Sequence, residues 1–150
     1  MTNDERRGTS IDTRYEIRDT KSDRTSQGKP LRVAVVGPCA SGKSTLVEAL
    51  REAGYDARHP AQEHSYVKDM WQRLVDPDAL IYLDLSHAAY RQRRPKDDAG
   101  PGYLEMQRER LAHARAHADV VVDTTGMTVE AVRELVLTEL RALDPNSLRL

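Results

Sequence analysis

Hydrophobic residues in this chain alternate between short continuous runs and longer segments with helical spacing. The runs at 31–36, 79–85 and 120–123 are rich in Val, Ile and Leu, which is typical of buried parallel strands. A thinner run at 55–59, ended by Pro60, predicts a short additional strand. The pattern therefore predicts four strands.

Helical spacing of apolar residues marks the segments between these strands. Helices are expected at 45–53, at 66–74, after the N-cap Ser86, at 103–117 and after the N-cap Thr128. Three of these helices have a clear predicted inward face. For the helix at 66–74 it is Val67, Met70, Trp71 and Leu74, and for the helix at 103–117 it is Leu104, Leu111, Ala114 and Ala118. For the helix after Thr128 it is Val132, Leu135, Val136, Leu140 and Leu143.

Alternation of strands and helices predicts an α/β fold: a three-layer parallel sheet of about four strands flanked by helices. Ligands of such sheets bind at the carboxyl ends of the strands. This rule selects four candidate site segments, at 37–44, at Glu63 and His64, at 84–87 and at 123–126.

Composition bounds the class of protein. The chain has 150 residues, of which 31% are charged, and a net charge of −1, so we expect one globular domain without a general attraction to nucleic acid or membranes. No apolar run approaches the ~20 residues needed to span a bilayer, and no secretory signal is expected. The single cysteine, Cys39, fits a reducing compartment, so a cytoplasmic location is expected. Residues 1–29 are polar and predict a disordered tail, which leaves 30–150 as the folded domain.

One motif carries most of the functional information. Residues 37–45 read Gly-Pro-Cys-Ala-Ser-Gly-Lys-Ser-Thr, which fits the Walker A spacing, and they lie between a predicted strand and a predicted helix. In that context glycines let successive backbone N–H groups point at phosphate oxygens, Lys43 reaches the β- and γ-phosphates, and the Ser44 hydroxyl holds Mg²⁺. The expected phosphate-binding residues are Gly37, Pro38, Cys39, Ala40, Ser41, Gly42, Lys43, Ser44 and Thr45.

The chain resembles the small P-loop kinases, the group that includes adenylate, cytidylate and shikimate kinases. Three stretches of this sequence carry the resemblance: the loop at 37–45, the strand at 80–84 with the Arg-bearing helix after it, and the Asp-Thr-x-Gly stretch at 123–126. The resemblance covers about residues 31–143 and implies that the loop containing Gly126 lies near a nucleotide base. The third strand that is usual in this group is not evident between His59 and Pro77.

Phosphoryl transfer would need further charged groups around the phosphates. Lys43, Arg91 and Arg94 are the cationic candidates for catalysis, with Arg93 beside them, and Arg108 and Arg110 match a region where relatives place a phosphate-contacting arginine. Exposed positions on helices are the alternative interpretation for all five arginines. Glu63 is the candidate base or second magnesium ligand, and Asp84 is the runner-up for the metal.

Several other assignments stay open or are disfavoured. Tyr66, Met70 and Trp71 would line an acceptor pocket or, as the spacing favours, belong to the core. Cys39 is expected to be a small filler residue rather than a redox-sensitive thiol, and one cysteine with scattered histidines lacks the spacing of a zinc site. No Asn-Lys-x-Asp guanine motif occurs, which favours ATP over GTP.

The sequence thus predicts an ATP- and Mg²⁺-dependent phosphotransferase that acts on a small-molecule acceptor such as a nucleoside or nucleotide. The alternative is a nucleotide-binding regulatory or partner-binding module with weak or no catalysis. In both cases the partners expected are ATP and small molecules, with a protein partner allowed and nucleic acid and membranes excluded.

Overall fold

The computed structural model describes residues 28–145, so most of the predicted tail at 1–29 lies outside the described residues. Within this range the strands form one four-stranded, all-parallel sheet in the order β3-β2-β4-β5. The strands are β2 (Arg32–Val36), β3 (Asp56–Arg58), β4 (Ala79–Asp84) and β5 (Val120–Asp123). The prediction of an α/β fold with a four-stranded parallel sheet is confirmed.

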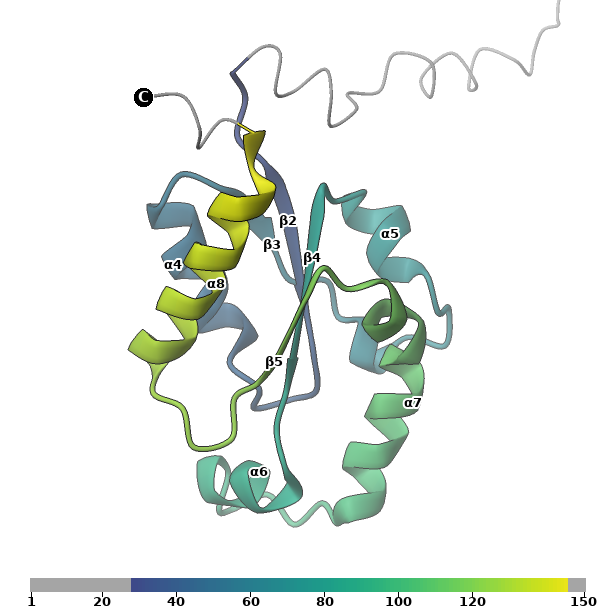
Figure 1. The fold of residues 1–150 in the computed structure, drawn as a ribbon. Coiled ribbons are helices and arrows are strands. Elements are labelled where there is room, and N and C mark those ends of the chain that lie inside the picture. The colour runs from purple at the N-terminus through teal and green to yellow at the C-terminus, as the bar shows by residue number, and fades with distance from the viewer. Residues whose placement is uncertain (1–27, 146–150) are drawn as a thin grey trace, which may run out of the picture.

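Helices cover both faces of the sheet (Figure 1). α4 (Lys43–Glu52) and α8 (Val129–Leu143) lie on one face, and α5 (Met70–Val75) and α7 (Pro101–His117) lie on the other. The short helix α6 (His87–Arg93) and the 3-10 turn η1 (Gln62–His64) lie toward the end of the sheet where the strands terminate. The carboxyl ends of the strands therefore share one end of the molecule, at the bottom of Figure 1.

Local chemistry explains why the helices begin where they do. Ser86 and Thr128 accept hydrogen bonds from the N–H groups of Ala89 and Ala131, so both predicted N-caps are confirmed. Gly54, in a left-handed conformation with φ of 100°, follows the end of α4. Both N-caps lie in the short segments that follow β4 and β5.

The second predicted helix starts later than the sequence indicated, at Met70 rather than Tyr66. The buried side chain of Gln62 explains the delay, because it donates a hydrogen bond to the carbonyl of Val67 and accepts one from the N–H of Trp71. These bonds stabilise a non-helical backbone before Met70. The predicted helix at 103–117 instead begins earlier, because Pro101 fits the first helical position.

Three predicted inward residues are wrong. Val67 is 40% exposed, Leu74 60% and Leu135 41%, whereas Val75 and Leu137 are buried. In α5 the buried pair Trp71 and Val75 is spaced by four residues, so the contacting stripe excludes Leu74. Trp71 belongs to the core on the α7 side of the sheet, as the core interpretation predicted. The other predicted inward residues that are fully buried are Leu104, Leu111, Ala114, Val132, Val136 and Leu140.

The described residues between β3 and β4 form only η1 and α5, without a further strand. The short strand β3 pairs directly with β2. No helix within residues 28–145 has the length and apolar character that a bilayer crossing requires.

Core packing between α8 and the sheet gives a stability prediction. Leu140 is fully buried in the cluster that joins α4, α8 and the sheet, so Leu140→Ala should lower the free energy of unfolding by about 2–5 kcal/mol. Leu135→Ala, on the exposed side of the same helix, should cost less than about 1 kcal/mol. Urea unfolding, monitored by circular dichroism, measures the free energy of unfolding of both variants. Equal losses of stability would contradict the burial of Leu140 and the exposure of Leu135 on α8.

Candidate functional site

The site is built on the glycine-rich loop, residues 37–45, which joins β2 to α4. Gly37 lies so close to the sheet that an added Cβ would be 2.3 Å from the carbonyl oxygen of Leu83 in β4. Gly42 and Ala40 adopt positive φ values of 98° and 67°. The loop therefore wraps tightly around the start of α4, whose first backbone N–H groups have no acceptor within the helix.

The electrostatics of this helix start favour an anion. The first turn of α4 has no acidic residue, and its N-cap, Gly42, offers no side-chain oxygen. The unsatisfied N–H groups and the positive end of the helix dipole are therefore available to a ligand. Ser41, buried to 2% exposure, carries a hydroxyl without a hydrogen-bond partner among residues 28–145.

Lys43 is the charged centre of the loop. Its Nζ donates to the carbonyl oxygens of Gly37 at 2.7 Å and Pro38 at 3.0 Å, and lies 2.9 Å from Oε2 of Glu63. The Lys43 and Glu63 side chains are only 11% and 6% exposed, so this is a buried ion pair. η1 thus supplies an acidic partner to the loop lysine, a contact that the sequence analysis did not predict.

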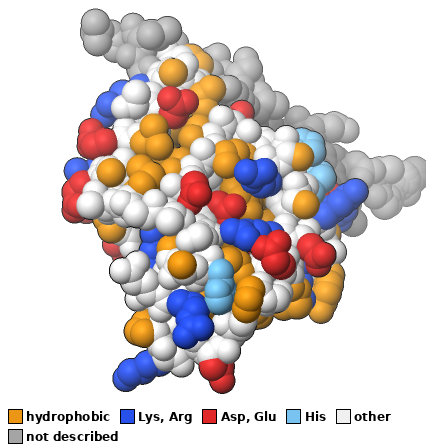
Figure 2. All heavy atoms as spheres, turned by 60° about the horizontal axis from the view of Figure 1, so that its bottom comes forward, with side chains coloured by type: hydrophobic (Ala, Val, Ile, Leu, Met, Phe, Trp, Pro, Cys, Tyr) orange, Lys and Arg blue, Asp and Glu red, His pale blue; other side chains and the backbone are white. Residues whose placement is uncertain are grey.

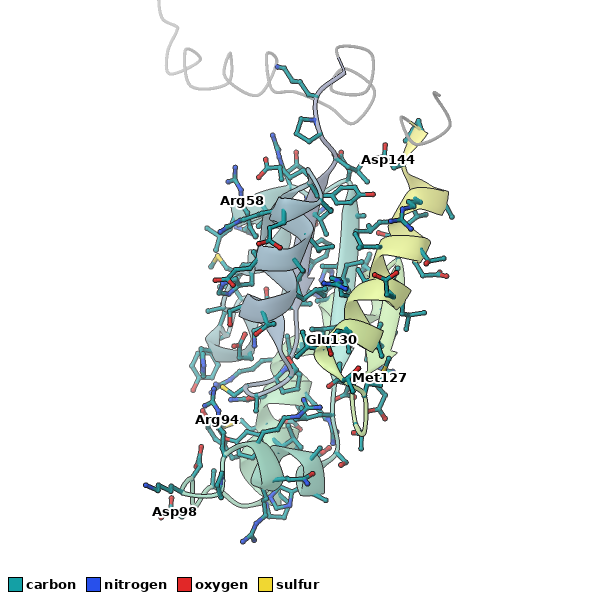
Figure 3. The ribbon with its side chains drawn as sticks, turned by 90° about the vertical axis from the view of Figure 1, so that its left-hand side faces the viewer. Arg58, Arg94, Asp98, Met127, Glu130 and Asp144 are labelled. Carbon is teal, nitrogen blue, oxygen red and sulfur yellow. The ribbon has the colours of Figure 1, made fainter. Side chains whose placement is uncertain are left out.

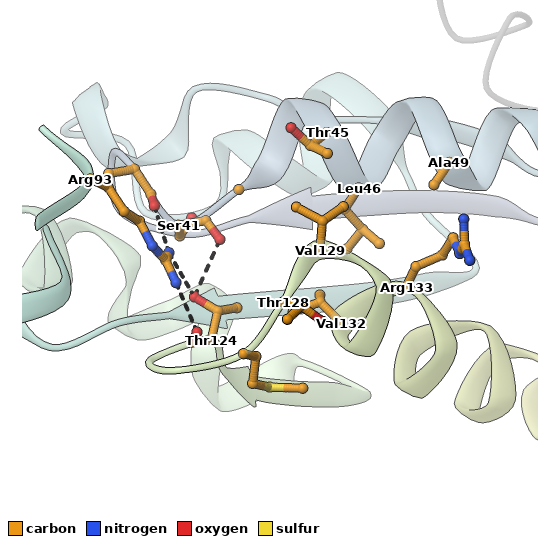
Figure 4. Close-up of a pocket in the computed structure, with 13 residues that line it drawn as sticks. Ser41, Thr45, Leu46, Ala49, Arg93, Thr124, Thr128, Val129, Val132 and Arg133 are labelled. Atoms are coloured by element: carbon orange, nitrogen blue, oxygen red, sulfur yellow. Dashed lines mark hydrogen bonds between the residues drawn. The ribbon is translucent and has the colours of Figure 1, made fainter.

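Arg93, at the end of α6, connects two loops across the site (Figure 4). Its guanidinium donates to the carbonyl of Ala40, and to both the hydroxyl and the carbonyl of Thr124. The Thr124 hydroxyl in turn donates to the carbonyl of Asp84 at 2.9 Å. These bonds fix the glycine-rich loop, the end of β4 and the loop after β5 relative to one another.

Two cavities open on either side of this connection. The smaller, of about 180 Å³, lies between the starts of α4 and α8 and is mostly apolar. Figure 4 shows its lining, which includes Leu46, Val129, Val132 and Arg133. The larger, of about 610 Å³, is lined by Cys39, Ala40, Gly42, Lys43, Ser44, His59, Ala61, Glu63, His64, Arg93 and Arg94. Ala40, Gly42 and Arg93 border both cavities, which are therefore neighbours.

The structure brings most of the predicted site residues together. Lys43, Ser44, Glu63 and Arg94 all line the larger cavity. Figure 3 shows Arg94 near the end of the molecule opposite Asp144. Figure 2 looks at this end and shows positive and negative side chains interspersed over its surface. Arg91 is exposed and borders neither of the two cavities within the described range.

Asp84 and Gly126 lie outside the larger cavity. Asp84 accepts a hydrogen bond from Arg108 at 3.3 Å and borders a separate cavity with Tyr82 and Arg115. Asp84 and Ser44 therefore border different cavities. Gly126, with φ of 74°, lies in the turn before Met127, which borders the smaller cavity.

Charge in that turn is held by local hydrogen bonds. Hydrogen bonds from Thr125 lower the pKa of the Asp123 carboxyl below its usual range. The Thr125 side chain has the larger effect and its backbone N–H the smaller one. The Thr125 hydroxyl also accepts the N–H of Ser86, which ties the turn to the start of α6. The loop after β5 is therefore held to the rest of the site at Thr125 as well as at Thr124.

Sequence reasoning missed the contacts of Gln107, which is fully buried on α7. Its side chain accepts the N–H of Cys39 at 2.9 Å and donates toward the Cys39 thiol at 3.2 Å. Arg110, also on α7, donates to the carbonyl of Glu63 and stacks over Tyr66. A glutamine within the inward stripe of a helix was the available signal, because buried amides need partners.

Comparison with known proteins adds one distant relative. No protein-family model matches the chain. A nucleotide-binding protein of Jannaschia sp. (strain CCS1) is 27% identical over 154 residues, in an alignment that covers 75% of this chain and 48% of that protein. The chain thus spans about half the length of the curated relative that it matches.

Proposed function

We propose that this chain binds a nucleoside triphosphate, with the phosphates on the glycine-rich loop, and that its fold is of the P-loop NTPase type. The observation that carries the proposal is Lys43, which lies at the start of α4 between two loop carbonyls and Glu63. A lysine held in this position can transfer its hydrogen bonds to phosphate oxygens without moving far. The name of the Jannaschia protein supports binding of a nucleotide.

The smaller cavity fits the base of the nucleotide. It borders the loop beside Gly42 and offers apolar side chains from α4 and α8, with Thr124 and Thr128 as hydrogen-bonding groups. Flat heteroaromatic rings bind in cavities of this kind, where apolar walls bury the ring and a few polar groups orient it. The positions of Gly42 and Arg93 at both cavities allow one ligand to extend from one to the other.

Mg²⁺ fits the same assignment. The Ser44 hydroxyl and the Glu63 carboxylate border the larger cavity together, and Oε1 of Glu63 is buried without a hydrogen-bond partner among residues 28–145. Hydroxyl and carboxylate oxygens suit this ion, which would neutralise phosphate charge when bound. Asp84 is a weaker candidate, because Arg108 already binds its carboxylate.

Phosphoryl transfer to a small acceptor is the activity that we propose for the larger cavity. Lys43 would orient the terminal phosphate, Arg94 would contribute positive charge, and Glu63 would accept a proton from the acceptor hydroxyl. The second candidate function is nucleotide binding without turnover. It is favoured by the short segment between β3 and β4, where the described residues form only η1 and a six-residue helix. A segment of this size offers few side chains to bind an acceptor.

Calorimetric titration tests the binding proposal. Titration of the whole chain with ATP and with GTP, each with Mg²⁺, should give micromolar affinity for ATP and weaker affinity for GTP. A screen for ATP-dependent phosphorylation of nucleosides, nucleotides and sugars then separates the two candidate functions. Absence of binding to both nucleotides would contradict the proposal itself.

Arg93→Ala should weaken ATP binding by roughly 10- to 100-fold, because the loop after β5 and the glycine-rich loop lose three shared hydrogen bonds. Arg93→Lys should recover little of the loss, since one ammonium cannot reproduce the forked geometry. Arg73→Ala, an exposed arginine on α5, is the charge-matched control. If Arg93→Ala binds ATP with wild-type affinity, the contacts that join the two loops do not contribute to ATP binding, and one ligand does not occupy both cavities.

A further inference from the structure

Three side chains that sequence spacing did not connect meet beside the glycine-rich loop. They are Cys39 of that loop and Glu63 and His64 of η1, and one ligand atom of each lies within 4.8 Å of the others. Sγ of Cys39 is 3.6 Å from Nε2 of His64, which is 3.9 Å from Oε2 of Glu63. Sequence spacing does not bring these three residues together, so their proximity is a product of the tertiary structure.

These separations are close to those of a tetrahedral zinc site. With ordinary Zn–S, Zn–N and Zn–O bond lengths, tetrahedral ligands are about 3.6 Å apart for S and N and about 3.4 Å apart for N and O. The Cys39–His64 separation already has this value, and the His64–Glu63 separation exceeds it by about half an ångström. The remaining pair, Cys39 and Glu63, lies within 4.8 Å, so a bound ion would draw these two side chains together by up to about 1.2 Å.

The Glu63 carboxylate points independently to a missing partner. Its side chain is 6% exposed, and although Oε2 binds Lys43, Oε1 is buried without a hydrogen-bond partner among the described residues. A buried carboxylate oxygen left in this state is costly. The oxygen nearest His64 is Oε2, so an ion in the cluster would satisfy Oε1 by binding both oxygens of the carboxylate. The backbone also holds the cluster, because Arg110 donates to the Glu63 carbonyl and Gln107 binds both N–H and thiol of Cys39.

Ligand chemistry selects the class of ion. A thiolate and an imidazole favour zinc and similar transition metals over Mg²⁺ or Ca²⁺, which take oxygen ligands. Three protein ligands leave a fourth position, which would face the larger cavity that all three residues border. Lys43 lies 2.9 Å from the same carboxylate and would compete with the metal for it, so we expect moderate affinity.

We propose that Cys39, Glu63 and His64 form a binding site for Zn²⁺ or a similar transition-metal ion. The proposal does not rest on nucleotide binding, because it needs only these three side chains. It does imply that the metal and the loop lysine share Glu63. Occupancy of the metal site would therefore change the charge that the loop presents to a ligand.

Cobalt is the probe for the test, because four-coordinate Co²⁺ absorbs strongly in the visible and a thiolate ligand adds a charge-transfer band in the near ultraviolet. The reduced, full-length protein is titrated with Co²⁺ in a buffer without phosphate or chelators. We expect both absorptions to saturate at one equivalent, and one equivalent of Zn²⁺ to abolish them. Absence of the thiolate band in the wild type would overturn the proposal.

Variants identify the ligands. Cys39→Ser should lose the charge-transfer band, and His64→Gln and Glu63→Gln should each weaken Co²⁺ binding by roughly tenfold or more. His64 is half-exposed, so its variant decides the matter even if Glu63→Gln folds poorly. His59→Gln is the matched control, because His59 borders the same cavity outside the ligand cluster. Unchanged Co²⁺ affinity in either His64→Gln or a folded Glu63→Gln would overturn the three-ligand site.

A second histidine pair could bind cobalt without a thiolate. His113 and His117 lie one turn apart on α7, with ring centroids separated by 4.3 Å. Visible absorption that persists in Cys39→Ser but disappears in His117→Gln would assign binding to this pair and overturn the proposal. A second test does not use cobalt absorption. Zn²⁺ should raise the midpoint of thermal unfolding of the wild type and should leave that of Cys39→Ser unchanged.

Discussion

Lys43→Ala should reduce ATP affinity by roughly 100-fold or more. The ammonium is held at the start of α4 by the carbonyls of Gly37 and Pro38, in the position where phosphate oxygens would replace them. The Lys43 side chain is only 11% exposed, so water would replace its hydrogen bonds to phosphate poorly. Calorimetric titration of ATP with Mg²⁺ measures the change.

The same substitution should also destabilise the protein, and the two effects must be separated. Removing Lys43 leaves the buried Glu63 carboxylate without its cation, which should lower the free energy of unfolding by about 3 kcal/mol. The double variant Lys43→Ala/Glu63→Gln removes both charges and should regain most of the stability. It should not regain ATP affinity, because the phosphate-binding ammonium is still absent.

The control for charge is Lys68→Ala, an exposed lysine that borders a different cavity near Tyr66. It should retain wild-type affinity and stability. Wild-type ATP affinity in Lys43→Ala would contradict the assignment of the glycine-rich loop to phosphate binding. Recovery of affinity in the double variant would show instead that misfolding caused the loss in the single one.

Periodicity was sufficient for most of the fold because the central strands β2 and β4 are buried on both faces, and because α4 and α8 place most of their apolar residues on one side. It was insufficient between β3 and β4, where a buried side chain controls the backbone. Gln62 forms hydrogen bonds with Val67 and Trp71 that delay the start of α5 to Met70. A helix predicted from local sequence alone cannot account for a backbone conformation that depends on the hydrogen bonds of one buried side-chain amide.

The site shows the same division between local and long-range information. The loop at 37–45 could be predicted because its function needs consecutive residues between a strand and a helix. The three hydrogen bonds of Arg93 to Ala40 and Thr124 span at least 31 positions and leave no periodic signal. The proximity of Cys39 to His64, 25 positions apart, is likewise a product of tertiary structure.

Gly37→Ala should destabilise the protein by about 2–3 kcal/mol and weaken ATP binding together. The added Cβ would lie 2.3 Å from the Leu83 carbonyl oxygen and 2.8 Å from Oγ of Ser41. Leu83 belongs to β4, which pairs with strands on both sides, so its backbone cannot move away. The loop must shift instead, and its N–H groups then no longer converge on one anion.

Gly102→Ala is the matched control, because it makes the same chemical change in open space near the start of α7. It should leave ATP binding unchanged and raise the free energy of unfolding by up to about 1 kcal/mol, since alanine favours the helix. Urea unfolding should therefore give shifts of opposite sign for the two variants. Equal stability of Gly37→Ala and wild type would mean that the loop does not pack against Leu83, and the proposed phosphate site would lose its geometric basis.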